Sequence, residues 1–117
     1  MMGDMTKNFS RAEFACKCGC GLDNIDPRLV ELLQAIRDFF NRPVRVVSGL
    51  RCPARNAKVG GAKRSKHLTG EAADIQVSDV APRAVADYAA THMRGWGGIK
   101  AYPSFTHIDI RQTLWRG

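Results

Sequence analysis

Two histidines and one aspartate in this sequence have the chemistry of a metal site. His67 and Asp74 lie in the segment SKHLTGEAADI, and His107 lies near the C-terminus in FTHIDIR. A carboxylate within an apolar run is costly unless a partner satisfies it. Two imidazoles and one carboxylate can hold zinc with a fourth position open, where the metal can acidify water and polarise a carbonyl. The alternative is that His67 is a surface loop residue and Asp74 a charge at a strand edge.

The segment FTHIDIR predicts a strand with one reactive face. Side chains two positions apart share a face of a strand, so His107, Asp109 and Arg111 point the same way. Ile108 and Ile110 point the other way and suit a core. This pattern is compatible with a functional face and equally with a half-exposed strand that carries charges.

Four cysteines form a second group of reactive side chains. Cys16, Cys18 and Cys20 lie in CKCGCG, and Cys52 follows SGLR. The C-x-C-x-C spacing departs from the C-x₂₋₄-C pattern of structural zinc sites. Reduced thiols, a disulfide from the cluster to Cys52 and a second metal site all stay open at this point.

The composition predicts one modest basic domain over residues 1–117. The chain has 117 residues, of which 44% are hydrophobic, and this suffices for a single core. Its formal charge of +7 favours an anionic partner such as nucleic acid, a membrane surface or a bacterial cell-wall polymer, although positive charge can also serve solubility alone. The basic residues are scattered and form no tail typical of nucleic-acid binding.

The sequence predicts no targeting or membrane-spanning segment. The N-terminal residues MMGDMTKNFSRAEF contain no apolar core of a signal peptide, and no apolar stretch is long enough to span a bilayer. We therefore expect synthesis in the cytoplasm without membrane insertion, and a separate route of export or release if the protein acts on the cell wall.

The predicted elements indicate an α+β fold. NIDPRLVELLQAIRDFFNRP predicts a helix, with Asp26 as N-cap, Pro27 in the first helical position and apolar residues at helical spacing. VRVVS and AADIQV predict strands, separated by a polar loop with room for one helical turn. APRAVADYAATHM predicts a second helix, capped by Ser78 or Asp79.

The C-terminal part completes a small sheet. GGIKAY and FTHIDIR predict two strands joined by a tight turn at Pro103 and Ser104. Two helices and about four strands then favour a small, mostly antiparallel sheet with helices packed on it.

Three ordered motifs resemble the superfamily of zinc D-Ala-D-Ala carboxypeptidases and peptidoglycan endopeptidases, whose fold is shared by the hedgehog signalling domain. SKHLTGEAADI matches the signature S-x-H-x-x-G-x-A-x-D, and SGLRCPARNAKVGGAKRSKH resembles the S-G-x-R segment and V-G-G loop that precede it. FTHIDIR resembles the late F-x-H-x-D segment of the small phage-associated bacterial branch, and FSRAEFACKCGCG is similar to the amino-terminal segment of that branch. The resemblance covers roughly residues 8 to 112.

The resemblance implies a zinc metallopeptidase that acts on peptidoglycan stem peptides, as a carboxypeptidase or an endopeptidase and as a candidate phage or prophage endolysin. By family position, His67, Asp74 and His107 bind one catalytic zinc ion. Arg51 would contact a carboxylate or carbonyl of the substrate, because its fork makes two hydrogen bonds and keeps its charge, with a structural salt bridge as the alternative. The hydroxyl of Ser65 would orient a ligand or the substrate.

The general base is where this chain departs from the family pattern. Several branches place an acid three residues before the last zinc histidine, where this chain has Ser104; another places a histidine two residues before it, where this chain has Phe105. We therefore expect Asp109 to act as the base or to orient the attacking water. The alternative role for Asp109 is to hold a ligand histidine in place.

Three functions stay compatible with the sequence. The first is a monomeric cell-wall peptidase with a peptidoglycan peptide as substrate, although the bond that it cuts is not readable. The second is a zinc-containing wall-binding module without turnover, which the missing acid at Ser104 suggests. The third is a basic nucleic-acid-binding protein with metal at the cysteines, but such a protein would not need the histidine–aspartate set. We therefore expect no nucleic-acid partner.

Overall fold

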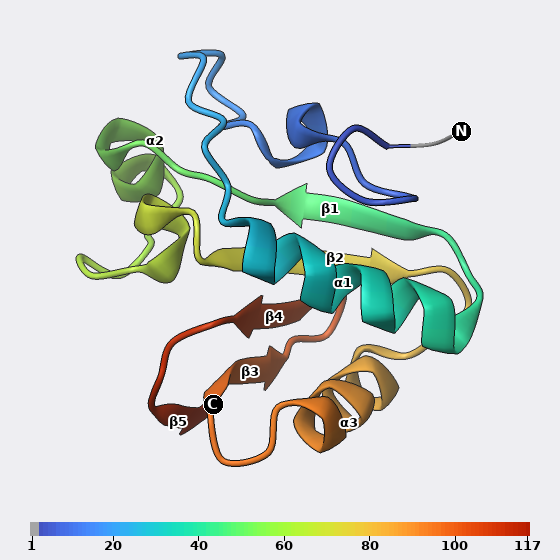
Figure 1. Cartoon of the computed structure of the whole chain (residues 1–117). Coiled ribbons are helices and arrows are strands. Elements are labelled where there is room, and N and C mark those ends of the chain that lie inside the picture. Colours follow the sequence, from blue (N-terminus) through green and yellow to red (C-terminus); the bar gives the residue numbers. More distant parts are fainter. Residues whose placement is uncertain (1–2) are drawn as a thin grey trace.

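A five-stranded sheet forms the frame of the molecule in the computed structural model, which describes residues 3–117 (Figure 1). The strands are β1 (Val44–Ser48), β2 (Ala72–Val77), β3 (Gly97–Ala101), β4 (Thr106–Asp109) and β5 (Leu114–Arg116). They lie in the order β1-β2-β4-β3-β5, and all neighbours are antiparallel except β3 and β5. The predicted α+β fold with a mostly antiparallel sheet is confirmed.

Helices α1 and α3 contact each other and pack against the sheet (Figure 1). The helical elements are α1 (Pro27–Phe40), α2 (Pro53–Lys58) and α3 (Pro82–His92), with short 3₁₀ helices η1 (Arg11–Phe14) and η2 (Lys66–Thr69). The sequence predicted a polar loop between β1 and β2 with room for one helical turn, and α2 lies in this loop. Among the described residues, no helix has the length and apolar character needed to cross a membrane.

The helix α1 forms for the local reasons that its sequence predicts. The Asp26 side chain accepts a hydrogen bond from the backbone N–H of Arg28 at 2.9 Å, and Pro27 follows it in the first turn. At the other end Asn41 adopts a left-handed conformation with φ of 51° and ends the helix before Pro43. The apolar stripe of α1 is buried, and it consists of Leu29, Val30, Leu32, Leu33 and Ile36.

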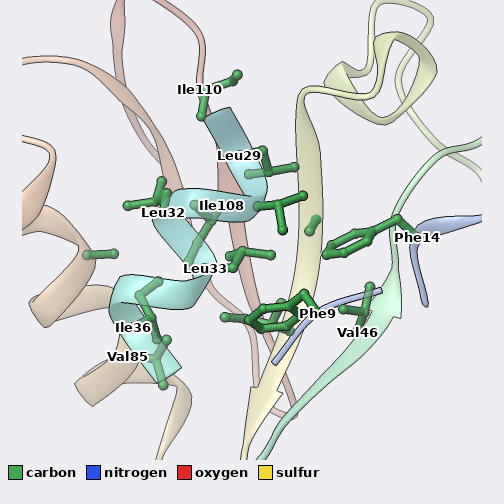
Figure 2. Close-up of a cluster of buried hydrophobic side chains, with 14 of the residues drawn as sticks. Phe9, Phe14, Leu29, Leu32, Leu33, Ile36, Val46, Val85, Ile108 and Ile110 are labelled. Atoms are coloured by element: carbon green, nitrogen blue, oxygen red, sulfur yellow. The ribbon is translucent and has the colours of Figure 1, made fainter. Parts of the chain in front are cut away.

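One cluster of apolar side chains forms the core (Figure 2). Leu33 and Ile36 of α1 belong to it together with Ile108 of β4. Phe9 and Phe14 from the N-terminal segment fill the same cluster, with their ring centroids 5.9 Å apart. The N-terminal segment is therefore part of the core and is held there by burial of aromatic area.

Replacing Asp26 by alanine is expected to lower the free energy of unfolding by about 1 kcal/mol, because the first turn of α1 loses its side-chain acceptor. Chemical denaturation would measure this loss. Glu31→Ala is the matched control, since Glu31 is exposed on the same helix and its removal should change stability by less than about 0.5 kcal/mol. Equal effects in the two variants would contradict the capping role.

Two features differ from the sequence predictions. The prediction that Ser78 or Asp79 caps the second helix is wrong, because the N-cap of α3 is Ala81, two residues after Asp79, and it makes no side-chain cap. Asp79 instead occupies a left-handed turn position with φ of 61° at the end of β2. Strand β5 was not predicted, because three residues are too short to show alternation and its parallel partner β3 is distant in sequence.

Candidate metal centre and active site

Strand pairing brings Asp74 and His107 next to each other. The antiparallel register of β2 and β4 pairs Asp74 directly with His107. Side chains alternate along a strand, so Ala73 and Ile108 point into the core while Asp74 and His107 occupy the opposite face. The alternation read from the sequence thus places both side chains on one face of the sheet.

The third residue, His67, comes from η2, immediately before β2. The Ser65 hydroxyl accepts a hydrogen bond from the backbone N–H of His67 at 3.2 Å and so caps this short helix. Gly70 ends η2 with φ of 75°, and a Cβ there would lie 2.7 Å from the carbonyl oxygen of Asn24. The glycine of the signature is therefore required for the turn that carries His67 to the sheet.

Three potential ligand atoms converge. His67 Nε2 lies 3.3 Å from Asp74 Oδ1, and His107 Nδ1 lies 3.0 Å from the same oxygen. The three side chains each offer a ligand atom within 4.8 Å of the others. The structure therefore brings together all three residues of the predicted zinc set.

The outer nitrogen of each imidazole is held by the protein. His67 Nδ1 lies 2.7 Å from the carbonyl oxygen of Gly49, to which it donates. His107 Nε2 lies 2.9 Å from Asp109 Oδ2. A ring nitrogen that donates outward leaves the inner nitrogen with a free lone pair, which is the usual arrangement of metal-binding histidines.

The carboxylates of this centre are held in the ionised form. Burial alone would raise the pKa of Asp74, but hydrogen bonds from His107 and His67 lower that pKa to about 2. Burial also opposes ionisation of Asp109, yet His107 and Arg111 hold its pKa well below the usual range. Burial lowers the pKa of His107, but Asp109 and Asp74 outweigh it and raise this pKa. The ionised Asp74 carboxylate lies at the point where the two imidazoles converge, and its negative charge favours a cation there.

Asp109 lies behind His107, on the side away from Asp74. Its side chain is fully buried, and Oδ1 accepts hydrogen bonds from the Arg111 backbone N–H at 3.1 Å and from Arg111 Nε at 2.8 Å. Oδ2 accepts from Arg111 Nη2 at 2.7 Å and from His107 Nε2. Both oxygens are therefore engaged, and this geometry favours the role of holding His107 over the role of general base.

Arg51 reaches the same centre from the segment after β1. Its Nη2 lies 3.4 Å from Asp74 Oδ2, its Nε 3.2 Å from Ser48 Oγ and its Nη1 3.2 Å from Asn56 Oδ1. A Cβ at Gly61 would lie 2.1 Å from Asn56 Oδ1, so the V-G-G loop must keep glycine at this position for Asn56 to reach the guanidinium. Arg51 forms the salt bridge that was the structural alternative, and it also lines the cavity described next.

An open cavity of about 500 Å³ lies over the three converging side chains. One wall is aromatic and contains Tyr102, Phe105 and Trp115. The rings of Tyr102 and Phe105 stack with their centroids 4.6 Å apart. The ring of Trp115 lies edge-on to the imidazole of His107, with the two ring centroids 5.8 Å apart. Further lining residues are basic, and they are Arg64, Lys66 and Arg111. The sequence left open whether Trp115 lines a substrate groove or only packs against its neighbours, and the structure places it, from β5, in this wall.

Asp74 is the one carboxylate among the described residues that line this cavity. Ser65 lines it as well, with its hydroxyl already used by the His67 backbone. Ser104, which takes the position of the missing acid, lies on another part of the surface beside Gln76, whose side-chain amide donates to its carbonyl oxygen at 2.9 Å. The site therefore offers three converging side chains that could hold a metal ion, a fixed guanidinium and an aromatic wall.

The comparisons with known proteins agree with this site. A family model described as Peptidase M15 matches residues 7–109. The chain is similar to the peptidoglycan L,D-endopeptidase MepK of Escherichia coli (strain K12), with 33% identity over 97 residues. A protein of the same name from Shigella flexneri has the same identity over the same length. The match covers 75% of this chain and 52% of each relative, so the chain spans about half the length of these relatives.

Proposed function

Because this chain belongs to the peptidase M15 family, we propose that it hydrolyses a peptide bond in the stem peptides of peptidoglycan and uses one zinc ion to do so. The observation that carries this proposal is the convergence of His67 Nε2, Asp74 Oδ1 and His107 Nδ1 at the floor of an open cavity. The net charge of +7 and the basic lining suit an anionic polymer as substrate. The name of the relatives favours an endopeptidase over a carboxypeptidase.

The residues of the centre fit zinc. Two nitrogen donors and one carboxylate oxygen are a ligand set typical of catalytic zinc, and both histidines have their outer nitrogens fixed by protein acceptors. When bound there, zinc would polarise a peptide carbonyl and make water more acidic. The low pKa of Asp74 keeps its carboxylate available as a ligand at neutral pH.

The surrounding side chains hold the substrate in this proposal. The Arg51 guanidinium is fixed by Ser48, Asn56 and Asp74, so it can donate to a substrate carbonyl or carboxylate with little loss of side-chain freedom. The aromatic wall offers apolar area for the aliphatic parts of a stem peptide. The Ser65 hydroxyl accepts from the His67 backbone N–H, and this contact supports a ligand-orienting role for Ser65 in this proposal.

Replacing Asp109 by asparagine tests whether this carboxylate holds His107. We expect zinc affinity to fall by roughly ten- to a hundredfold, because the amide cannot accept from both His107 and Arg111 as the carboxylate does. Turnover at saturating zinc should change much less. Titration against a zinc chelator measures the affinity, and rates are then compared at saturating zinc.

The general-base role would give the opposite result for the same variant. Zinc affinity would be kept, while the rate would fall by roughly 10²–10⁴. Asp87→Asn is the matched control, because Asp87 is exposed on α3 and the substitution makes the same change of charge. Thermal unfolding of both variants verifies that they are folded.

Digestion of purified peptidoglycan by the zinc-loaded protein tests the function itself. Mass spectrometry of the soluble products should show stem peptides cut at an internal bond, whereas free D-alanine alone would indicate a carboxypeptidase. His67→Ala protein is the negative control.

A wall-binding module without turnover is the second candidate. It is favoured by one observation, that Asp74 is the one carboxylate among the described cavity-lining residues. Sedimentation with the wall without any released product would support this candidate against the peptidase.

A further inference from the structure

The four cysteines lie together outside the cavity. Cys18 Sγ lies 3.4 Å from Cys16 Sγ and 3.5 Å from Cys52 Sγ, and all four sulfur atoms lie within 4.8 Å of one another. All four are free thiols. Cys16 is buried, Cys52 is half-buried, and Cys18 and Cys20 are exposed, so the cluster sits at the edge of the molecule. The proposed peptidase chemistry uses none of these thiols.

The spacing of the sulfur atoms fits a shared ion. Four thiolates bound to one zinc ion at about 2.3 Å occupy the corners of a tetrahedron whose edges are about 3.8 Å. The separations of 3.4 Å and 3.5 Å and the upper limit of 4.8 Å lie around this value. Disulfides would bring sulfur atoms together in pairs at about 2.0 Å, whereas here four sulfur atoms are mutual neighbours.

The backbone explains how an unusual C-x-C-x-C spacing can form such a cluster. The Cys16 N–H donates to the Leu22 carbonyl at 2.8 Å, which closes the loop, and the Gly19 N–H donates to the Cys16 carbonyl at 3.3 Å. Gly19 and Gly21 have φ of 82° and 88°, in the left-handed region. Gly19 turns the chain between Cys18 and Cys20, and Gly21 turns it directly after Cys20, so three side chains from one short loop converge.

Backbone N–H groups also point at two of the sulfur atoms. Cys16 Sγ accepts from the Cys52 N–H at 3.4 Å, and Cys52 Sγ accepts from the Arg55 N–H at 3.4 Å. Hydrogen bonds of this kind stabilise the charged thiolate more than the neutral thiol, and the thiolate is the form that binds metal. The loop and the segment around Cys52 are thus arranged for anionic sulfur.

We propose that Cys16, Cys18, Cys20 and Cys52 bind a second zinc ion in a closed tetrahedral site. Four protein ligands leave no open position, so the ion is structural and takes no part in peptide hydrolysis. Binding releases the thiol protons to solvent. This inference does not depend on the proposed activity, since it uses residues outside the cavity.

The second site would join the N-terminal segment to the segment that carries Arg51. Cys16 follows η1, whose Phe14 carbonyl accepts from the Leu50 N–H at 2.8 Å, and Cys52 directly follows Arg51. In Figure 1 the light-blue loop after η1 lies beside α2. A zinc ion held by both segments would cross-link them and limit the movement of Arg51 relative to the core.

Zinc analysis of the full chain, purified under reducing conditions without chelator, tests this inference. Elemental analysis should find about two zinc ions per chain in the unmodified protein and about one in either His67→Ala or the double variant Cys18→Ser/Cys20→Ser. Cobalt substitution gives a second readout, because tetrahedral thiolate ligation produces intense charge-transfer and d–d bands. These bands should be present in His67→Ala and absent from the double serine variant.

Lys17→Ala is the matched control for the loop, since Lys17 is exposed between two proposed ligands and the variant should keep both ions. The inference is overturned if the unmodified protein holds about one zinc ion while all four thiols react at once with a thiol reagent under native conditions. Disulfides in the freshly purified protein would overturn it as well, and iron in place of zinc would overturn the assignment of the metal. Because Cys18 and Cys20 are exposed, their replacement by serine is not expected to prevent folding.

Discussion

The His67→Ala variant is expected to lose the zinc ion of the active site and, with it, measurable hydrolysis of peptidoglycan. His67 provides one of three proposed ligand atoms, and the described residues that line the cavity include no histidine, cysteine or carboxylate beyond His67, Asp74 and His107 that could replace it. Bound zinc also stabilises the folded state. At a free zinc concentration one hundred times the dissociation constant this contribution is about 2.7 kcal/mol, and it should vanish in the variant.

The measurement is the zinc-dependent change in the free energy of unfolding, made in the Cys18→Ser/Cys20→Ser background so that the proposed second ion does not contribute. His67 is buried, so His67→Gln serves as a second variant that keeps more of the side-chain volume. His92→Ala is the matched control, because His92 is exposed at the end of α3. Full zinc occupancy in both His67 variants would show that the proposed ligand set is wrong.

The Arg51→Lys variant is expected to fold and bind zinc normally but to lose roughly 30- to 5000-fold in turnover, which corresponds to about 2–5 kcal/mol. The guanidinium contacts Ser48, Asn56 and Asp74 through three different nitrogens while facing the cavity. A lysine ammonium is a point charge and cannot reproduce this planar arrangement. Steady-state kinetics on a soluble stem peptide would measure the loss.

Arg83→Lys is the control for this substitution, because Arg83 is exposed on α3 and is not among the residues that line the cavity. Unchanged kinetics in Arg51→Lys would mean that the salt bridge to Asp74 is structural and that substrate is held elsewhere. A loss of zinc affinity in parallel with activity would instead show that Arg51 acts by orienting the Asp74 carboxylate.

The two proposed zinc sites are adjacent along the chain, although their ligands differ. Residues 48–67 supply Ser48, Arg51 and His67 to the active-site region and Cys52 to the cysteine cluster. After Ser48, the last residue of β1, this stretch contains only the short helix α2 and the beginning of η2, so few regular backbone hydrogen bonds hold it. Side-chain hydrogen bonds help to order this stretch, and zinc bound at the two proposed sites would order it further.

Local chemistry in the sequence determined several parts of this protein. The cap at Asp26 and the stripe of α1 depend on contacts within a few residues, so the helix could be predicted with its N-terminal boundary. The alternation in FTHIDIR likewise separated the core face from the face with His107 and Asp109. The predicted hairpin of β3 and β4 was confirmed for the same reason, because its two strands are neighbours in sequence.

Only the tertiary structure decided how these parts meet. The register of β2 on β4 places Asp74 beside His107, and the loop after β1 brings the Gly49 carbonyl and Arg51 to them from a distant segment. The parallel strand β5, which adds Trp115 to the cavity, and the approach of Cys52 to the N-terminal cysteines are also long-range contacts. Periodicity and spacing report on neighbours along the chain, whereas these contacts arise from strand pairing and burial of a shared core, whose energies depend on segments that the local pattern does not connect.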